Sequence, residues 1–262
     1  MKEPLLDVIF ASEERKNTLL LLHGGPKDME YLLKSLDTSR KALLPQIRIL
    51  EKHHLVGHSA DTYDLTTLGR IIVDKMLPLL GTVEVFDSDI DYWGTRDLEF
   101  IPPHLYTRLQ ELGTCTMVTA VPLTEVYEPS KQAVENAKRS TYQFSVTTFL
   151  FPTFPLLLED FGKNGTNMRL VVSTELLTKI KEGQNGHLRE LLKSDLNELY
   201  LYPKRMGFMA FGHNDFSFMM RIFNKSGIYD HKYVSFYSPS ALIWAKELFE
   251  YYLRDSTPII EI

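Results

Sequence analysis

Residues 38–69 read TSRKALLPQIRILEKHHLVGHSADTYDLTTLG, and the pattern of this segment predicts the fold of the first part of the chain. Its first half predicts a helix over 39–53, because apolar residues recur at the spacing that buries one stripe of a helix. The stripe consists of Leu43, Ile47, Leu50 and His54. Pro45 lies near the start of this helix and indicates a later start or a kink, since proline removes a backbone hydrogen bond.

The second half of the stretch predicts a β-hairpin and a further helix. Strand-like residues at 55–59 and 63–65 flank a polar turn at 60–62. Thr66 can cap a helix that we expect over 66–80 and that carries the chain to Gly81.

Three helices are expected before this stretch, over 5–10, 13–22 and 27–36, with the second ending at the Gly-Gly-Pro sequence of 24–26. The order helix, helix, short helix, turn, basic helix, hairpin, helix is typical of a winged helix-turn-helix. In that fold the basic helix projects far enough to enter the ~12 Å major groove of DNA, and the hairpin contacts the duplex beside it.

The charge distribution supports DNA as the partner, although the net charge is −5. Residues 1–80 carry equal numbers of basic and acidic residues, so the whole excess of acid falls on the remainder. Within 38–58 four Lys or Arg residues face Glu51 alone, and DNA affinity depends on the local field rather than on the total charge. The residues predicted to contact DNA are Lys27, Ser39, Arg40, Lys41, Gln46 and Arg48, with His58, Ser59 and Thr62 on the hairpin.

Residues 81–262 predict a mixed α/β domain, because strand-like runs alternate with helical patterns. The strand-like runs are 115–121, 145–151, 168–173, 198–202, 208–212, 217–223 and 233–237. The helical patterns are 103–112, 130–140, 154–163, 174–182, 187–194 and 239–254. We therefore expect a DNA-binding domain with a linker helix over 1–80 and a domain over 81–262 that senses a signal and dimerises.

Polar residues among aromatic ones in this second part indicate a pocket for a small effector of unknown identity. The residues predicted to line it are Arg96, Tyr200, Tyr202, Phe211, His213 and Asp215. The alternative is a polar turn above an aromatic core. The single cysteine, Cys115, is either an oxidant sensor or buried packing, and packing is the more common role of a cysteine in an apolar run.

The sequence contains no familiar catalytic or cofactor motif, so neither an enzyme nor a cofactor is expected. His54 and His58 lie four residues apart, but no third ligand completes a metal site. Apolar runs are too short for a membrane span, the N-terminus lacks the pattern of a secretion signal, and one cysteine suits a reducing compartment. We therefore expect a soluble, cytoplasmic protein.

Residues 38–69 resemble the winged-helix half of archaeal regulators with an arsenic-repressor-like DNA-binding domain. The resemblance rests on Ile47, Leu50, Leu55 and Val56 and on the hairpin exit formed by Tyr63, Leu65, Thr66 and Gly69. Further motifs resemble the family of methanogenesis/filamentation regulators and methyltransferase-specific regulators of methanogenic archaea. They are Trp93 with Asp97-Leu98 and Ile101-Pro102, Phe151-Pro152, Gly227 with Tyr229-Asp230, and Trp244 with Glu247-Leu248-Phe249.

The resemblance implies a homodimeric transcription factor for methanogenesis-related genes, with two winged helices docking ~34 Å apart on double-stranded DNA. Two alternatives remain open at this stage. Burial of Arg40, Lys41 and Arg48 at an interface would favour a protein-interaction adaptor that no longer binds DNA. A deep pocket holding a strongly perturbed carboxylate or histidine would favour an enzyme that uses residues 82–262.

Overall fold

The computed structural model describes residues 3–118, 128–182 and 196–260, and the chain divides into two compact units, Met1–Leu80 and Gly81–Ile262. We call them the first and the second unit. The helix α5 (Thr67–Asp87) contains the boundary between them. Among the described residues, no helix combines the length and apolarity needed to cross a lipid bilayer.

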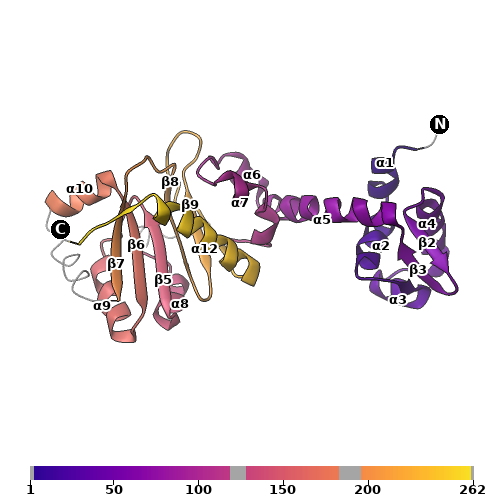
Figure 1. Cartoon of the computed structure of the whole chain (residues 1–262), viewed down its shortest axis with the longest axis horizontal. Coiled ribbons are helices and arrows are strands. Elements are labelled where there is room, and N and C mark those ends of the chain that lie inside the picture. Colours follow the sequence, from indigo (N-terminus) through magenta and orange to yellow (C-terminus); the bar gives the residue numbers. More distant parts are fainter. Residues whose placement is uncertain (1–2, 119–127, 183–195, 261–262) are drawn as a thin grey trace. The chain divides into compact units, whose positions relative to one another are not determined.

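The first unit contains the predicted succession of helices followed by a hairpin (Figure 1). Its elements are α1 (Leu5–Phe10), α2 (Glu13–His23), β1 (Lys27–Asp28), α3 (Met29–Ser35), α4 (Arg40–Lys52), β2 (Val56–Ser59) and β3 (Thr62–Leu65), followed by the first part of α5. The strands form a small antiparallel sheet in the order β1-β3-β2.

The start of the helix predicted over 27–36 is corrected by the structure. Lys27 and Asp28 form the strand β1, which pairs with Tyr63 and Thr62 of β3. The helix α3 begins only at Met29, because the Asp28 carboxylate caps it by accepting a hydrogen bond from the Tyr31 N–H at 2.7 Å.

The helix α4 begins at Arg40 despite Pro45, so the late start predicted from that proline is wrong. The Ser39 hydroxyl fixes the start by accepting from the Ala42 N–H at 3.3 Å. The predicted continuation of the buried stripe to His54 is also wrong. His54 is exposed and has a φ of 59°, because the chain leaves the helix there through the left-handed region.

The core of the first unit is formed by the buried faces of its helices. Fully buried side chains include Leu19 and Leu22 of α2, Leu32 of α3, Leu43, Ile47 and Leu50 of α4, and Val73 of α5. Where the hairpin leads into α5, Gly69 lies so close to the Leu55 carbonyl oxygen that a Cβ would be 2.0 Å from it. The hairpin exit therefore requires glycine at this position.

The helix α5 continues to Asp87, past the end predicted at Gly81. Gly81 does not end the helix. It permits a close approach instead, because a Cβ there would lie 2.8 Å from the Cβ of Gln110.

The second unit is built on an eight-stranded mixed sheet in the order β11-β7-β6-β5-β8-β9-β10-β4. Its strands are β4 (Thr116–Val118), β5 (Tyr142–Thr147), β6 (Asn167–Ser173), β7 (Asn197–Tyr202), β8 (Phe208–Asn214), β9 (Phe218–Ile222), β10 (Tyr233–Phe236) and β11 (Thr257–Pro258). The central strands β5, β6 and β7 run parallel, and the other pairings are antiparallel.

Helices cover both faces of this sheet (Figure 1). The helices of the second unit that the structure describes are α6 (Ile90–Gly94), α7 (Pro103–Tyr106), the 3₁₀ helix η1 (Leu109–Leu112), α8 (Lys131–Arg139), α9 (Phe154–Asn164), α10 (Thr174–Glu182) and α12 (Pro239–Arg254). One face packs Val146, Phe211 and Phe218 against α12. The opposite face packs Leu170 with Ala137 of α8 and Phe161 of α9.

Two elements of this unit differ from their sequence-based predictions by more than two residues. The strand predicted over 145–151 lies at 142–147, because the Thr147 hydroxyl accepts from the Phe149 N–H at 3.0 Å and turns the chain. The helix predicted over 103–112 is divided into α7 and η1. The helix predicted over 187–194 and the last residues of the run 115–121 lie outside the described residues.

Candidate nucleic-acid interface and ligand pocket

Four basic residues of α4 form an exposed surface that we call the α4 cationic face: Arg40, Lys41, Arg48 and Lys52. Lys41, Arg48 and Lys52 repeat at the spacing that aligns side chains on one side of a helix. Among the described residues none of the four forms an ion pair, whereas Lys16 of the same unit pairs with Glu13 at 2.6 Å. The α4 cationic face therefore carries positive charge that no carboxylate of the described chain neutralises.

The hairpin lies beside this face. Helix α4 packs against the hairpin strand β2. Burial and the charge of Glu51 raise the pKa of Tyr63 on β3, while the charges of Arg40 and Arg48 act against that rise. The ring of His58 stacks on Tyr63 with the centroids 4.4 Å apart, and His58 is exposed. Helix α4 and the hairpin thus contribute to one continuous surface.

The other residues predicted to contact DNA differ in their exposure and in whether they already have a partner. Ser59 and Thr62 are exposed at the hairpin tip, where the Thr62 hydroxyl donates to the Ser59 carbonyl at 3.0 Å. The Ser39 hydroxyl is occupied by its capping bond, and the Lys27 ammonium lies 4.9 Å from the centre of the Tyr31 ring. Gln46 is half-buried on the core side of α4, and its Oε1 is buried without a hydrogen-bond partner in the described part of the chain.

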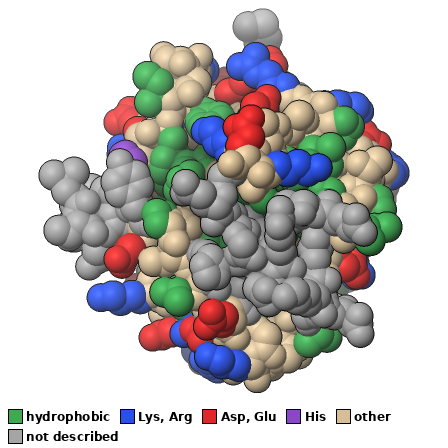
Figure 2. All heavy atoms as spheres, turned by 90° about the vertical axis from the view of Figure 1, so that its left-hand side faces the viewer, with side chains coloured by type: hydrophobic (Ala, Val, Ile, Leu, Met, Phe, Trp, Pro, Cys, Tyr) green, Lys and Arg blue, Asp and Glu red, His purple; other side chains and the backbone are tan. Residues whose placement is uncertain are grey.

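The second unit presents a different surface. Figure 2 shows one side of it, on which the described Lys and Arg side chains alternate with Asp and Glu side chains. The charge on this side is mixed, in contrast to the single sign of the α4 cationic face.

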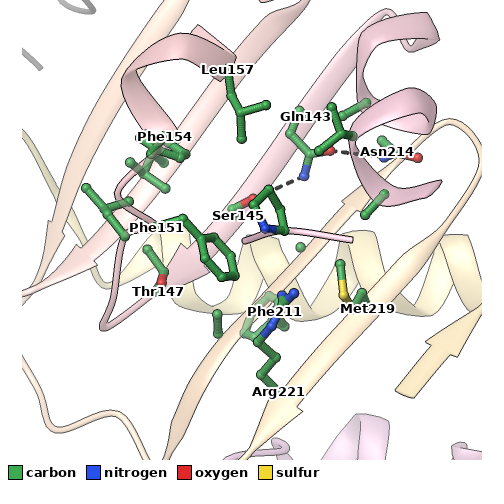
Figure 3. A pocket seen from close by; sticks show the side chains of 18 of the residues that line it. Gln143, Ser145, Thr147, Phe151, Phe154, Leu157, Phe211, Asn214, Met219 and Arg221 are labelled. Atoms are coloured by element: carbon green, nitrogen blue, oxygen red, sulfur yellow. Dashed lines mark hydrogen bonds between the residues drawn. The ribbon is translucent and has the colours of Figure 1, made fainter. Parts of the chain in front are cut away.

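A pocket of about 130 Å³ lies in the second unit, on the face of the sheet covered by α8 and α9 (Figure 3). The side chains that line it are mostly apolar or aromatic, and the polar ones come mainly from the strands. The lining includes Phe149, Phe151, Phe154, Leu157, Leu170 and Met219, together with Gln143, Ser145, Thr147, Asn214, Ser217 and Arg221.

A chain of hydrogen bonds holds the polar wall in place. The Asn214 amide donates to the Gln143 carbonyl oxygen at 3.0 Å, and the Gln143 amide donates to the Ser145 hydroxyl at 3.1 Å (Figure 3). Gly212 leaves room for this arrangement, because a Cβ there would lie 2.7 Å from the Ser145 hydroxyl oxygen. These side chains are fixed before any ligand arrives.

Arg221 of β9 is the one charged residue among the described residues that line the pocket. It is 9% exposed, and its guanidinium carbon lies 5.1 Å from the centre of the Phe151 ring and 4.8 Å from that of Tyr233. Among the described residues no carboxylate forms an ion pair with Arg221, whereas Arg169 on β6 pairs with Glu198 at 3.0 Å. Burial raises the pKa of Tyr229, and the charge of Arg221 together with a hydrogen bond between its guanidinium and the Tyr229 hydroxyl opposes that rise.

The six residues predicted to form an effector pocket do not come together. Phe211 is among the residues that line the pocket, but its ring packs against Phe218 and Tyr252 on the α12 face. His213 points to the same face and lies among Tyr142, Phe144 and Phe249. Burial lowers the pKa of His213 to about 4, and its two buried ring nitrogens have no hydrogen-bond partner among the residues that the structure describes. The exposed Asp215 accepts hydrogen bonds from the Thr141 N–H and hydroxyl at 2.7 and 2.8 Å.

Arg96, Tyr200 and Tyr202 also have structural partners away from the pocket. Arg96 is buried, pairs with Asp230 at 2.5 Å and lies over the Tyr92 ring. The Tyr200 hydroxyl donates to Glu198. Tyr202 packs against Tyr252, with ring centres 5.0 Å apart.

Sequence reasoning missed Gln143, Ser145 and Arg221. The alternation of polar and aromatic residues in 142–147 would have indicated one pocket-facing and one core-facing side of β5.

Cys115 is buried, and its sulfur lies 2.9 Å from the Ser88 hydroxyl. Burial raises the pKa of its thiol, which disfavours the reactive thiolate. This environment favours a packing role for Cys115 over oxidant sensing.

The chain matches two family models. Residues 3–84 match the N-terminal domain, and residues 126–255 the middle domain, of the methanogenesis regulatory protein FilR1. A curated relative, the methanogenesis regulatory protein FilR1 of Methanothrix harundinacea (strain 6Ac), is 25% identical over 260 residues, which is 97% of this chain. The chain spans 58% of the length of that relative.

Similar solved structures include that of TrmBL2, described as an archaeal chromatin protein with a novel mode of DNA binding. It is 14% identical, with a TM-score of 0.43 over 95% of this chain and 94% of its own. A phospholipase D family member, Nuc from Salmonella typhimurium, is 10% identical, with a TM-score of 0.41 over 55% of this chain and 98% of its own. Both scores are too low to support an argument about function.

Proposed function

Because the chain belongs to the FilR1 family of methanogenesis regulatory proteins, we propose that it regulates transcription by binding double-stranded DNA. The observation that carries this proposal is the α4 cationic face, which is exposed and lacks ion pairs among the described residues. The first unit acts as a winged helix-turn-helix. Its helix α4 enters the major groove, and His58, Ser59 and Thr62 of the hairpin meet the adjacent backbone.

Within α4, Lys41 and Arg48 are the residues best placed to contact DNA, and Arg40 and Lys52 extend the same face. Arginine can read a guanine edge or bind a phosphate, and lysine binds phosphate as a point charge. Gln46 is poorly placed for base contact, because its carbonyl oxygen is directed into the first unit's own interior.

The second unit acts as the sensing part, and the assembly is a homodimer that controls methanogenesis-related genes. The pocket supports sensing, since a largely apolar pocket with a few fixed polar groups is typical of small-molecule sites. Exposed apolar residues on α5, among them Leu68, Ile71 and Leu79, support self-association. The pocket lining contains no carboxylate, histidine or cysteine among the described residues, so it offers no acid–base pair for catalysis.

The test is the affinity of the full chain for duplex DNA from its own upstream region, measured by fluorescence anisotropy. We expect the double variant Lys41→Glu, Arg48→Glu to bind at least 100-fold more weakly, because two attractive contacts become repulsive. The matched control is Lys163→Glu, Lys225→Glu, which changes the net charge equally on exposed residues of the second unit and should change affinity less than threefold.

Two results would contradict the proposal. One is the absence of binding to any duplex DNA at low salt. The other is an equal loss in both double variants, because that would make the total charge, and not the α4 cationic face, the determinant of affinity.

A further inference from the structure

We propose that the pocket of the second unit binds a small organic anion with an apolar body about the size of one six-membered ring, held by Arg221. This inference rests on the sensing role proposed above and names the chemical class of the ligand.

The charge of the lining residues determines the sign of the ligand. Arg221 is the single charged side chain among the described lining residues, so the pocket carries one positive charge. A guanidinium remains protonated at any physiological pH, and burying its charge without a carboxylate is unfavourable. The Phe151 and Tyr233 rings stabilise it in part through cation–π contacts. An anion that enters the pocket would complete the neutralisation.

Arg169 is an arginine in a similar aromatic environment that does have a carboxylate partner. Its guanidinium carbon also lies 5.1 Å from an aromatic ring, that of Phe144, but it forms an ion pair with Glu198. The two arginines lie on different strands of one sheet, β6 and β9, and differ in having, or lacking, an acid partner among the described residues. The Tyr229 hydroxyl uses part of the hydrogen-bonding capacity of Arg221. The remaining guanidinium donors, which no carboxylate among the described residues engages, are available for a carboxylate or a phosphate.

The volume and the apolar wall determine the body of the ligand. A cavity of about 150 Å³ is known to accommodate benzene, and this pocket measures about 130 Å³. Phe151 and Phe154 lie on one side of it, and Gln143 and Asn214 lie on the other (Figure 3). An aromatic ring or a short aliphatic chain fits this space.

The polar wall can orient the charged end of the ligand. The Ser145 hydroxyl accepts from Gln143, and among the described residues its own proton has no acceptor. That proton can be donated to a ligand oxygen. The Asn214 carbonyl oxygen accepts from the Phe216 and Ser217 N–H groups, so Asn214 holds Gln143 rigidly in place.

The test uses isothermal titration calorimetry of the full chain with phenylacetate and with phenylacetamide, a neutral molecule of nearly the same shape. We expect phenylacetate to bind at least tenfold more tightly than the amide. Arg221→Met, which keeps the apolar volume and removes the charge, should abolish that preference. Arg169→Met is the matched control and should leave the preference unchanged, because Arg169 does not line the pocket.

Further probes determine whether the charged end of the ligand is a carboxylate or a phosphate. Phenyl phosphate binding more tightly than phenylacetate would identify a phosphate ester as the charged end and would support the proposal. Inorganic phosphate binding as tightly as phenylacetate would overturn it, since the apolar body would then contribute nothing. Equal affinity for the acid and the amide, unchanged affinity in Arg221→Met, or no binding of any probe would also overturn it.

Thermal melting of each variant shows whether it folds. If Arg221→Met does not fold, Ser145→Ala provides the second variant, and a threefold to tenfold loss of phenylacetate affinity is expected; an unchanged affinity overturns the proposal. DNA binding is measured on the same preparations. A parent chain that binds DNA but no anion contradicts only the proposed ligand of the pocket. A parent chain that binds the anion but no DNA contradicts only the proposed role as a regulator.

Discussion

The arginines of the α4 cationic face and Arg221 in the pocket share one chemical property, because none of them has a carboxylate partner among the described residues. They differ in exposure. Arg40 and Arg48 are exposed to solvent, whereas Arg221 is 9% exposed between two aromatic rings.

This difference indicates what kind of anion each can recognise. Exposed cations on a helix act together through a field that extends about a Debye length and is weakened by salt, which suits a polyanion. A buried guanidinium acts through short hydrogen bonds in a site largely protected from salt, which suits one small molecule.

The largest effect is expected from Gly69→Ala, which should disrupt the first unit and its α4 cationic face while leaving the pocket of the second unit intact. The new Cβ would lie 2.0 Å from the Leu55 carbonyl oxygen, a backbone atom that cannot move without distorting the hairpin. We expect the first unit to lose more than ~3 kcal/mol of stability and DNA binding to disappear, while phenylacetate binding persists. Calorimetric melting of the full chain measures this, with Gly162→Ala, which meets no atom within 4 Å, as the control. An unchanged melting profile in Gly69→Ala would contradict the close approach.

Salt should separate the two kinds of site. If each of the four cations of α4 neutralises one phosphate, the logarithm of DNA affinity falls with a slope of about −3.6, which is about 150-fold between 50 and 200 mM salt. Phenylacetate affinity should fall less than threefold over the same range. Equal salt dependence of the two ligands would show that burial does not distinguish the sites.

The third prediction concerns acid stability of the second unit. The folded-state pKa of His213 is about 4 because of burial, below its ordinary value of 6.5. The unfolded chain therefore binds the proton more readily, so stability is full above pH 6.5 and falls as the pH drops towards 4. At pH 5 the loss amounts to about 2 kcal/mol.

The variant His213→Phe tests this, because it removes the titrating group and keeps an aromatic ring. Its denaturant midpoint should fall less than that of the parent chain between pH 7.5 and 5. The exposed His104→Phe should follow the parent chain. Parallel behaviour of all three proteins would refute the assignment of the acid sensitivity to His213.

The smallest effects are expected from the helix caps, which support each site indirectly. Ser39→Ala removes the cap of α4. Ser130→Ala removes the equivalent cap of α8, where the Ser130 hydroxyl accepts from the Ala133 N–H at 3.1 Å. Each should cost about 1 kcal/mol. Ser39→Ala should weaken DNA binding by a few-fold and leave phenylacetate binding alone, and Ser130→Ala should do the reverse. The result that would disprove this separation is a change in both affinities from one cap.

Sequence patterns predicted the first unit well because its signals are local. The spacing of Leu43, Ile47 and Leu50 and the turn between the two hairpin strands depend on residues close in the chain. The strand β1 escaped prediction because its partner is Tyr63, thirty-six positions away from Lys27. The end of α5 was predicted too early, because a glycine often ends a helix, whereas Gly81 lies within α5 and allows the close approach of Gln110.

The pocket was poorly predicted because it is assembled from strands that are distant in sequence. Gln143 lies beside Asn214 only through the pairing of β5 with β8. His213 looked like a ligand contact, but the alternation of side chains along β8 turns it to the α12 face. A polar residue in an aromatic run marks a pocket only when the face of its strand is known.

The alternation along β5 also has a consequence for how members of the family can diverge. Phe144 and Val146 belong to the packed interior under α12, while Gln143, Ser145 and Thr147 line the pocket. Substitutions at the odd-numbered positions can therefore alter ligand preference without disturbing the hydrophobic packing. An inserted or deleted residue would exchange the two sets, so evolution can retune this strand by replacement but not by changes in its length.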